Sequence, residues 1–309
     1  MPSHEMGHDL SIELEQPENE KQWKNFSVAV FGSRDNGNKY AVENSDVIGR
    51  ILARDGYNAC NGGYKQGGMG AMARAFVSEC REQGMTDEEI KPHLIGFVMP
   101  KGAIEAMFDE PTERPLIGAD TDTSDKSDVT AATIEERPTL EQRQGDLIQN
   151  ADAWIATEGG SGTVAEIMEA LLSERDRRDS SDPSLARPVI IIDNEHKALR
   201  YLLEKAKHEE VRNIPADTFY ILSGRKMAEG NHDETIHDLP VVPRSLPEDD
   251  QMTKQLEMIL EYHSLLKENN SENDDRIAEI RKQLFDPESG IRALTLDDIF
   301  RGDKTEATT

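Results

Sequence analysis

The stretch DAWIATEGGSGTVAE, residues 152–166, constrains the fold more than any other part of the chain. Its apolar run 153–156 has the length of a buried strand, and the apolar residues that follow the glycines recur at helical spacing. A strand, a glycine-rich turn and a helix in this order place free N–H groups and a positive dipole end at one point, which predicts a phosphate-binding loop. Glu166 is expected on the first turn of this helix, with its carboxylate toward the ligand. The alternative is a tight turn without a ligand.

The same alternation extends over most of the chain. Strands are expected at 26–31, 57–60, 93–99, 152–157, 188–192 and 218–222, and helices at 39–55, from the 62–70 loop to about 83, and at 139–150, 162–178 and 195–210. Strands and helices that alternate regularly imply right-handed crossovers, so the predicted fold is α/β: a Rossmann-type, doubly wound parallel sheet with helices on both faces. The apolar, β-branched run 189–192 fits a strand buried on both faces.

Changes in composition divide the chain into three parts. Residues 1–25 read as a flexible N-terminal segment, 26–228 as the nucleotide-binding and catalytic domain, and 229–309 as a linker with a C-terminal helical extension. A polar stretch at about 101–137 is expected to be a long loop or insertion over the site. Helices are expected at about 248–268 and 272–285, with a short segment at 294–300. The stripe of Met252, Leu256, Ile259, Leu260 and Leu266 predicts docking onto the main domain or a partner subunit.

Charge and composition exclude several classes of function. The net charge is −26, with 35 Lys and Arg against 61 Asp and Glu, which argues against binding to nucleic acid or to an anionic membrane. The acidic runs are expected to be solvated faces, or to reflect a high-salt environment. No signal peptide or apolar run of membrane-spanning length is recognisable, so the protein is expected to be cytoplasmic. Cys60 and Cys80 are predicted to be buried thiols, and His4 and His8 to be exposed rather than metal ligands.

Three glycine-containing loops follow predicted strands, at Gly32-Ser33, 62–70 and 158–163. Because ligands bind beyond the carboxyl ends of the strands in a doubly wound sheet, these loops predict a nucleotide or sugar-phosphate site. None has the GK[ST] of a P-loop, and the first lacks GxGxxG. The candidate binding residues are Ser33, Gly63, Gly67, Met69, Gly70, Gly159, Gly160, Ser161, Gly162 and Thr163.

The pairing of the 62–70 loop with GGSGTVAE at 159–166 resembles the LOG family, the cytokinin riboside 5′-monophosphate phosphoribohydrolases formerly described as lysine decarboxylases. The resemblance covers about 26–223 and includes residues 30–33, Tyr40 and Arg143, which lies fifteen residues before Glu158. It implies hydrolysis of the N-glycosidic bond of a nucleoside 5′-monophosphate, AMP or an N6-modified AMP, to free base and ribose 5-phosphate. It also implies a homodimer, no metal and no cofactor.

Arg143 and Glu166 are the candidate catalytic residues. Cleavage of an N-glycosidic bond builds positive charge on the sugar, which a carboxylate such as that of Glu166 stabilises, or the carboxylate orients the attacking water. The resemblance makes Arg143 the second catalytic residue, and its guanidinium suits bidentate contact with phosphate or ribose oxygens. The alternatives are a surface salt bridge from Arg143 to Glu141 or Asp146, and a first-turn glutamate favoured by the helix dipole.

Three positions depart from the family's usual pattern. Glu158 stands in place of a proline, Gln144 in place of a lysine, and Gly68 in place of a leucine. The first two add a negative charge and remove a positive one, so they predict weaker phosphate affinity or a changed substrate. They favour the alternative function, a nucleotide-binding or sensing Rossmann protein without turnover. A lysine decarboxylase fits least, because no lysine has a recognisable pyridoxal-phosphate setting.

Overall fold

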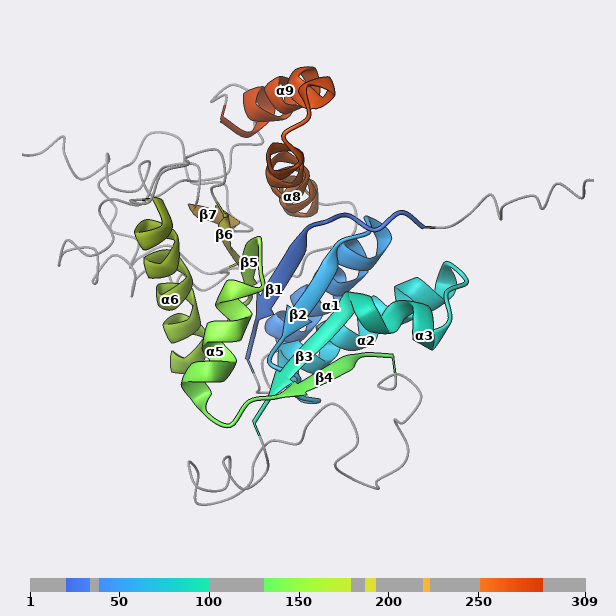
Figure 1. Ribbon diagram of the computed structural model, residues 1–309, viewed down its shortest axis with the longest axis vertical. Coiled ribbons are helices and arrows are strands. Elements are labelled where there is room, and N and C mark those ends of the chain that lie inside the picture. Colours follow the sequence, from blue (N-terminus) through green and yellow to red (C-terminus); the bar gives the residue numbers. More distant parts are fainter. Residues whose placement is uncertain are drawn as a thin grey trace, which may run out of the picture.

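The computed structural model describes residues 21–33, 39–99, 131–178, 187–192, 219–222 and 251–285. These residues form a seven-stranded, wholly parallel sheet in the order β4-β3-β2-β1-β5-β6-β7 (Figure 1). The predicted Rossmann-type α/β fold is therefore confirmed. The strands are β1 (Ser27–Phe31), β2 (Asn58–Asn61), β3 (Leu94–Val98), β4 (Thr133–Glu136), β5 (Ala153–Ala156), β6 (Val189–Ile192) and β7 (Phe219–Leu222).

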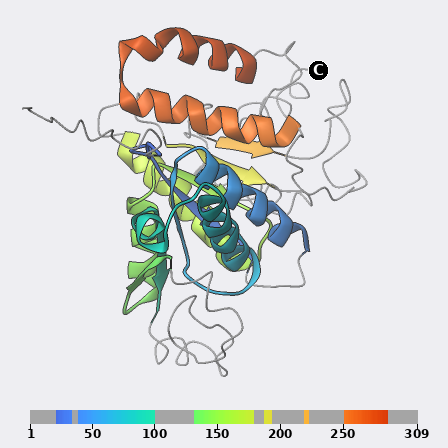
Figure 2. The same ribbon diagram turned by 90° about the vertical axis from the view of Figure 1, so that its right-hand side faces the viewer.

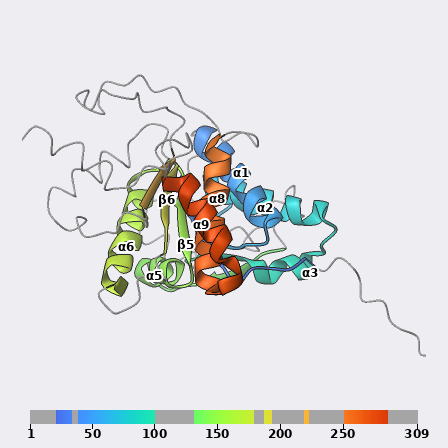
Figure 3. The same ribbon diagram turned by 90° about the horizontal axis from the view of Figure 1, so that it is seen from above.

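Helices cover both faces of the sheet. Helices α1 (Lys39–Arg54) and α2 (Gly67–Glu82) lie on one face, and α5 (Leu140–Gln149) and α6 (Ser161–Arg178) lie on the other (Figure 3). Helix α8 (Gln251–Glu268) packs on the α1 side, and α9 (Asp274–Phe285) lies outside α8 (Figure 2). Three short helices complete the described elements: α3 (Asp87–Ile90), η1 (Lys91–His93) and η3 (Ser271–Asn273).

Alternate strand residues supply the two layers of the core. In β6, Ile190 and Ile192 belong to the cluster formed with α1, α2 and α8, whereas Val189 and Ile191 belong to the cluster formed with α5 and α6. All four side chains are buried. A strand with apolar, β-branched residues at every position is stable here because helices exclude water from both sides.

The apolar stripe of the C-terminal extension docks onto the main domain, which is one of the two predicted arrangements. Leu256, Ile259 and Leu260 of α8 are fully buried in the cluster on the α1 side of the sheet. At the other end of α8, Lys267 Nζ lies 2.8 Å from Asp152 Oδ2. This helix therefore completes a layer of the Rossmann-type sandwich.

The structure corrects the expected irregular segment at 101–137. Its last residues form β4, which pairs in parallel with β3 at the described edge of the sheet. This strand is difficult to recognise in the sequence TIEE, because an edge strand has half-exposed side chains and tolerates charge. Residues 101–130, the helix expected at 195–210, the segment at 294–300, and His4 and His8 lie outside the described residues.

The expectation for the two cysteines is met. Both cysteines are free and buried. None of the described helices combines the length and apolar composition needed to cross a membrane.

The order of the strands locates the ligand-binding edge. From β1 the chain steps outward through β2, β3 and β4, and it then returns to place β5 on the opposite side of β1. In doubly wound sheets, ligands bind in the crevice beyond the carboxyl ends of the two strands where this reversal occurs. Here those strands are β1 and β5, which are followed by Gly32-Ser33 and Thr157-Glu158.

Candidate functional site

Beyond the carboxyl ends of the strands, the structure brings the three predicted loops together. The N–H of Gly68, at the start of α2, donates to the carbonyl of Ser33 after β1 at 2.8 Å. A Cβ placed on Gly32 would lie 2.9 Å from Thr157 Oγ1, which comes from the loop after β5. The loops after β1, β2 and β5 therefore contact one another at the switch point of the sheet.

Asn61 holds the second loop in shape. Its side chain is 1% exposed. Its Nδ2 donates to the carbonyl of Met69 at 3.0 Å, and its Oδ1 accepts from the N–H of Gly63 at 2.7 Å. Gly63 has φ +71°, a left-handed conformation that favours glycine. Sequence reasoning missed Asn61, although an asparagine before two glycines is typical of an Asx turn.

The start of α2 packs closely against this loop. Gly67 opens the helix with φ +60°, and a Cβ on Gly70 would lie only 2.0 Å from the carbonyl oxygen of Lys65. Met69 is buried in a small apolar cluster with Tyr64 and Met99. These glycines thus allow close approach of backbone to backbone, and the apolar cluster forms a wall beside Arg143.

Arg143 is the central side chain of this edge. It is the fourth residue of α5 and is 7% exposed. Its Nε donates to the carbonyl of Phe97 at 2.9 Å, its Nη2 donates to the carbonyl of Gly62 at 3.5 Å, and its guanidinium lies 5.1 Å from the ring centroid of Tyr64. The guanidinium therefore reaches the ends of β3 and β2 from the face of the sheet that α5 covers, opposite to the face covered by α2.

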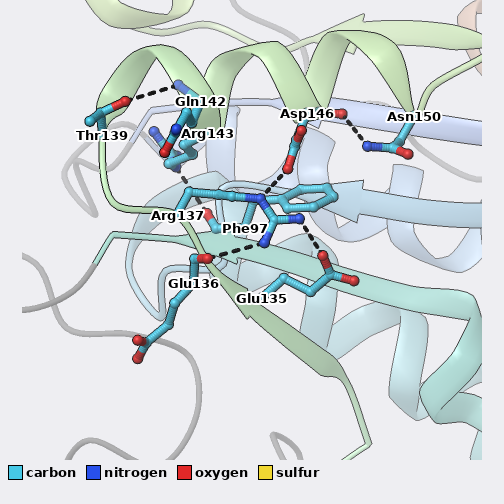
Figure 4. A network of polar contacts seen from close by, with 9 residues as sticks. All are labelled: Phe97, Glu135, Glu136, Arg137, Thr139, Gln142, Arg143, Asp146 and Asn150. Atoms are coloured by element: carbon cyan, nitrogen blue, oxygen red, sulfur yellow. Dashed lines mark hydrogen bonds and ion pairs between the residues drawn. The ribbon is translucent and has the colours of Figure 1, made fainter.

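The salt bridge considered for Arg143 is absent from the described part of the chain. Asp146 pairs with Arg137 instead (Figure 4), and Glu141 is exposed. Among the described residues, the polar contacts of Arg143 are carbonyl oxygens, which leave its positive charge uncompensated by a carboxylate. A buried charge without a counter-ion is costly, so this arrangement favours an incoming anion.

The loop after β5 leads into α6 as predicted. Thr163 is 7% exposed, and a Cβ on Gly159 would lie 2.1 Å from Thr163 Oγ1, so this glycine is required for the tight turn. Gly160 and Gly162 are exposed, with open space where a Cβ would stand. Ser161 is the first residue of the helix. The first-turn N–H groups of any helix have no intrahelical acceptor, which makes this end attractive to an anion.

Glu166 does not lie on the first turn of α6, which contains no acidic residue. The helix begins at Ser161, so Glu166 is its sixth residue and lies on the second turn. The dipole alternative loses its basis, because that effect is confined to the first turn. Arg143 and Glu166 lie on neighbouring helices of the same face, each within two turns of the helix N-terminus (Figure 1).

Glu158, the least typical residue of the motif, is 9% exposed. It follows β5 directly and precedes the glycines of the α6 loop. Its carboxylate therefore places a negative charge at the same edge of the sheet as Arg143, beyond the carboxyl ends of the strands. No group of three or more His, Cys, Asp or Glu side chains gathers in a metal-binding arrangement within the described ranges.

These features define a Rossmann-type α/β protein in which the loops at the switch point of the sheet lie beside a buried arginine. No protein-family model and no curated protein matches the chain. Among solved structures, the chain is similar to a molybdenum cofactor carrier protein from Chlamydomonas reinhardtii, with 15% identity, 63% of this chain and 88% of that chain covered, and a TM-score of 0.38.

It is also similar to a molybdenum cofactor binding protein from Rippkaea orientalis, with 16% identity, 66% and 91% coverage and a TM-score of 0.37. A third similar structure is DNA processing protein A from Helicobacter pylori, with 15% identity, 60% and 74% coverage and a TM-score of 0.37.

Proposed function

We propose that this protein hydrolyses the N-glycosidic bond of a nucleoside 5′-monophosphate, releasing a free base and ribose 5-phosphate. The observation that carries the proposal is the buried guanidinium of Arg143, which contacts two backbone carbonyls and has no carboxylate partner among the described residues. Such a group is preorganised to bind an anionic phosphate or the oxygens of a ribose.

The neighbouring elements supply the other requirements of the reaction. The exposed turn at Gly160 and the N-terminus of α6 offer backbone N–H groups to the 5′-phosphate. Glu166, one turn further along α6, supplies a carboxylate near the sugar. The resemblance of residues 62–70 and 159–166 to the LOG motifs supports the same assignment, with AMP or an N6-modified AMP as substrate.

In the proposed reaction, water attacks C1′ of the ribose as the bond to the base nitrogen breaks. The sugar ring becomes positively charged in the transition state, and the carboxylate of Glu166 stabilises that charge or orients the water. Water supplies the hydroxyl on C1′ and the proton on the departing base, so the products are the base and ribose 5-phosphate. Arg143 holds the phosphate or ribose oxygens in place during this step.

A second candidate is a nucleotide-binding protein without turnover. The burial of Glu158 beside the proposed phosphate loop favours it, because a carboxylate there opposes a phosphate and weakens the electrostatic gain from Arg143. The two candidates differ in one measurable respect: only the hydrolase releases a free base.

The experiment measures base release from a panel of nucleoside 5′-monophosphates by wild type, Glu166→Gln and the control Glu141→Gln. Glu141 is an exposed carboxylate on α5, so its neutralisation is expected to leave the rate within a factor of about 2. Loss of the stabilising carboxylate in Glu166→Gln is expected to lower kcat by about 100-fold or more. Nucleotide binding by calorimetry without release of any base would establish the binding protein instead.

A further inference from the structure

Arg137 connects the edge of the sheet to helix α5 (Figure 4). Its backbone N–H donates to the carbonyl of Val98 in β3 at 2.7 Å, and its guanidinium lies 5.2 Å from the ring centroid of Phe97. The same guanidinium makes ion pairs with Glu135 of β4 and, through Nε, with Asp146 of α5. One side chain therefore contacts β3, β4 and α5.

Two of these contacts lead directly to Arg143. Phe97 presents its ring to Arg137 and its backbone carbonyl to Arg143, whose Nε donates to that oxygen at 2.9 Å. Asp146 is three residues after Arg143 on α5, almost one helical turn away. Arg137 thus contacts both the residue that provides the acceptor and the helix that provides the donor.

We propose that Arg137 is a positioning residue that acts through Arg143: by joining Phe97 to Asp146, it sets the height at which α5 presents the Arg143 guanidinium over the end of the sheet. The catalytic consequence rests on the proposed function. The positioning itself concerns only the contact between Arg143 and Phe97.

The apolar packing of α5 leaves room for this role. Leu147 and Ile148 are buried in the core, but both lie C-terminal to Arg143 on the helix. The N-terminal turn is held by Thr139, whose Oγ1 accepts from the N–H of Gln142 at 3.2 Å. That cap stabilises the turn itself without fixing its distance from β3. Leu140, the first residue of α5, packs against the apolar cluster that contains Met99, so Arg137 adds a polar connection to β3 beside this apolar contact.

The partial exposure of Arg137 and Asp146 distinguishes a positioning role of this ion pair from a contribution to the stability of the fold. The side chains of Arg137 and Asp146 are 26% and 28% exposed, and ion pairs in such settings contribute little to stability. A shift of about 1 Å in a catalytic group, in contrast, lowers the rate by about 100-fold. A positioning role therefore predicts a large effect on kcat together with a nearly unchanged melting temperature.

The kinetic test is a double-mutant cycle of Arg137→Ala and Arg143→Lys on the full chain, with AMP as substrate. We expect Arg137→Ala to lower kcat by about 10- to 100-fold in the wild-type background but by less than about 3-fold beside Arg143→Lys, because the geometry it protects is already lost. Equal, additive losses in both backgrounds would overturn the proposal. Arg276→Ala is the matched control, since Arg276 of α9 pairs with Glu261 of α8 and with Glu279 of its own helix.

A second readout does not depend on turnover. The Arg143 Nε–H is hydrogen bonded to Phe97, so its exchange with solvent, followed by ¹⁵N NMR, reports on the contact directly. We expect exchange to accelerate at least about 10-fold in Arg137→Ala and not in Arg276→Ala. Unchanged exchange contradicts the positioning role, whereas a wild type that releases no base contradicts only the proposed function. Should Arg137→Ala fail to fold, Arg137→Lys, which retains one ion pair, replaces it and is expected to show an intermediate exchange rate.

Discussion

The guanidinium of Arg143 lies directly over Gly62: a Cβ on that glycine would stand 2.0 Å from Nη2 and 2.6 Å from the sulfur of Met69. A methyl group fits there only if the Arg143 guanidinium and the Met69 sulfur move. A glycine in the loop after β2 and a cation on α5 are thus parts of one arrangement, although 81 positions separate them in the sequence.

This contact predicts the effect of Gly62→Ala. The methyl group must displace the flexible end of Arg143, so base release is expected to fall by about 100-fold while the fold is retained. Gly145→Ala is the control, because a Cβ on this α5 glycine meets nothing within 4 Å. Steady-state kinetics and thermal melts compare the two variants, and wild-type kinetics in Gly62→Ala would contradict the assigned role of Arg143.

The turn before α6 is tested by Gly159→Ala, with Gly145→Ala again as the control. Gly159→Ala would bring a Cβ within 2.6 Å of Thr163 Cβ, which cannot move without distorting the helix start, whereas Gly145→Ala enters open space on α5. We expect Gly159→Ala to weaken binding of ribose 5-phosphate by about 10-fold or more and Gly145→Ala to change it by less than about 3-fold. Isothermal titration measures both, and equal affinities would show that this turn does not bind phosphate.

Helix α8 is expected to be essential to the stability of the sandwich. Leu260 is completely buried, so Leu260→Ala should lower the free energy of unfolding by about 2–5 kcal/mol. The exposed Glu268 on the same helix is the control, and Glu268→Ala should change it by less than about 0.5 kcal/mol. Urea denaturation measures both values, and a negligible effect of Leu260→Ala would mean that α8 does not pack on the sheet in solution.

The raised pKa values of the two buried thiols lead us to expect a loss of stability at alkaline pH. Burial raises the pKa of the Cys60 thiol to about 12 and that of Cys80 to about 11, against 9.0 for an ordinary thiol. Above pH 9 the unfolded chain releases these protons while the folded chain retains them, so the contribution to stability is complete below pH 9 and is lost as the pH rises toward the folded pKa values.

Denaturation curves at pH 8 and pH 10.5 test this expectation, with Cys60→Ala as the comparison. The wild type should lose more stability between the two values than the variant does. The native thiols should also react with iodoacetamide at pH 8 only after unfolding, because the thiolate is the reactive form. Equal pH dependence in wild type and variant would contradict the raised pKa.

The sequence reveals the buried elements best. Runs such as Val189–Ile192 are stable in a sheet that is covered on both faces, so β6 follows from its composition, and the fold class follows from the regular alternation of strands with helices. The strand β4 cannot be predicted in this way, because Thr133–Glu136 lies at an edge of the sheet where burial imposes no pattern on the sequence. Its presence depends on pairing with β3, a relationship between distant segments that periodicity does not encode.

The site also has parts that the sequence predicts and parts that it does not. The glycines after β2 and β5 mark their turns locally, so their positions were predictable. The burial of Arg143 was not, because a helical arginine near Glu141 and Asp146 also fits a surface salt bridge. Only the tertiary structure shows that Arg137 takes Asp146, which leaves Arg143 to the carbonyls of Phe97 and Gly62.

The most direct test of the central claim is to quantify both products formed from AMP. Wild type should release adenine and ribose 5-phosphate in equal amounts, and Arg143→Ala should do so at least about 100-fold more slowly, because the phosphate or ribose loses its buried cation. Absence of free base from AMP and every other nucleoside 5′-monophosphate, with a protein that is folded by circular dichroism, would contradict the hydrolase assignment.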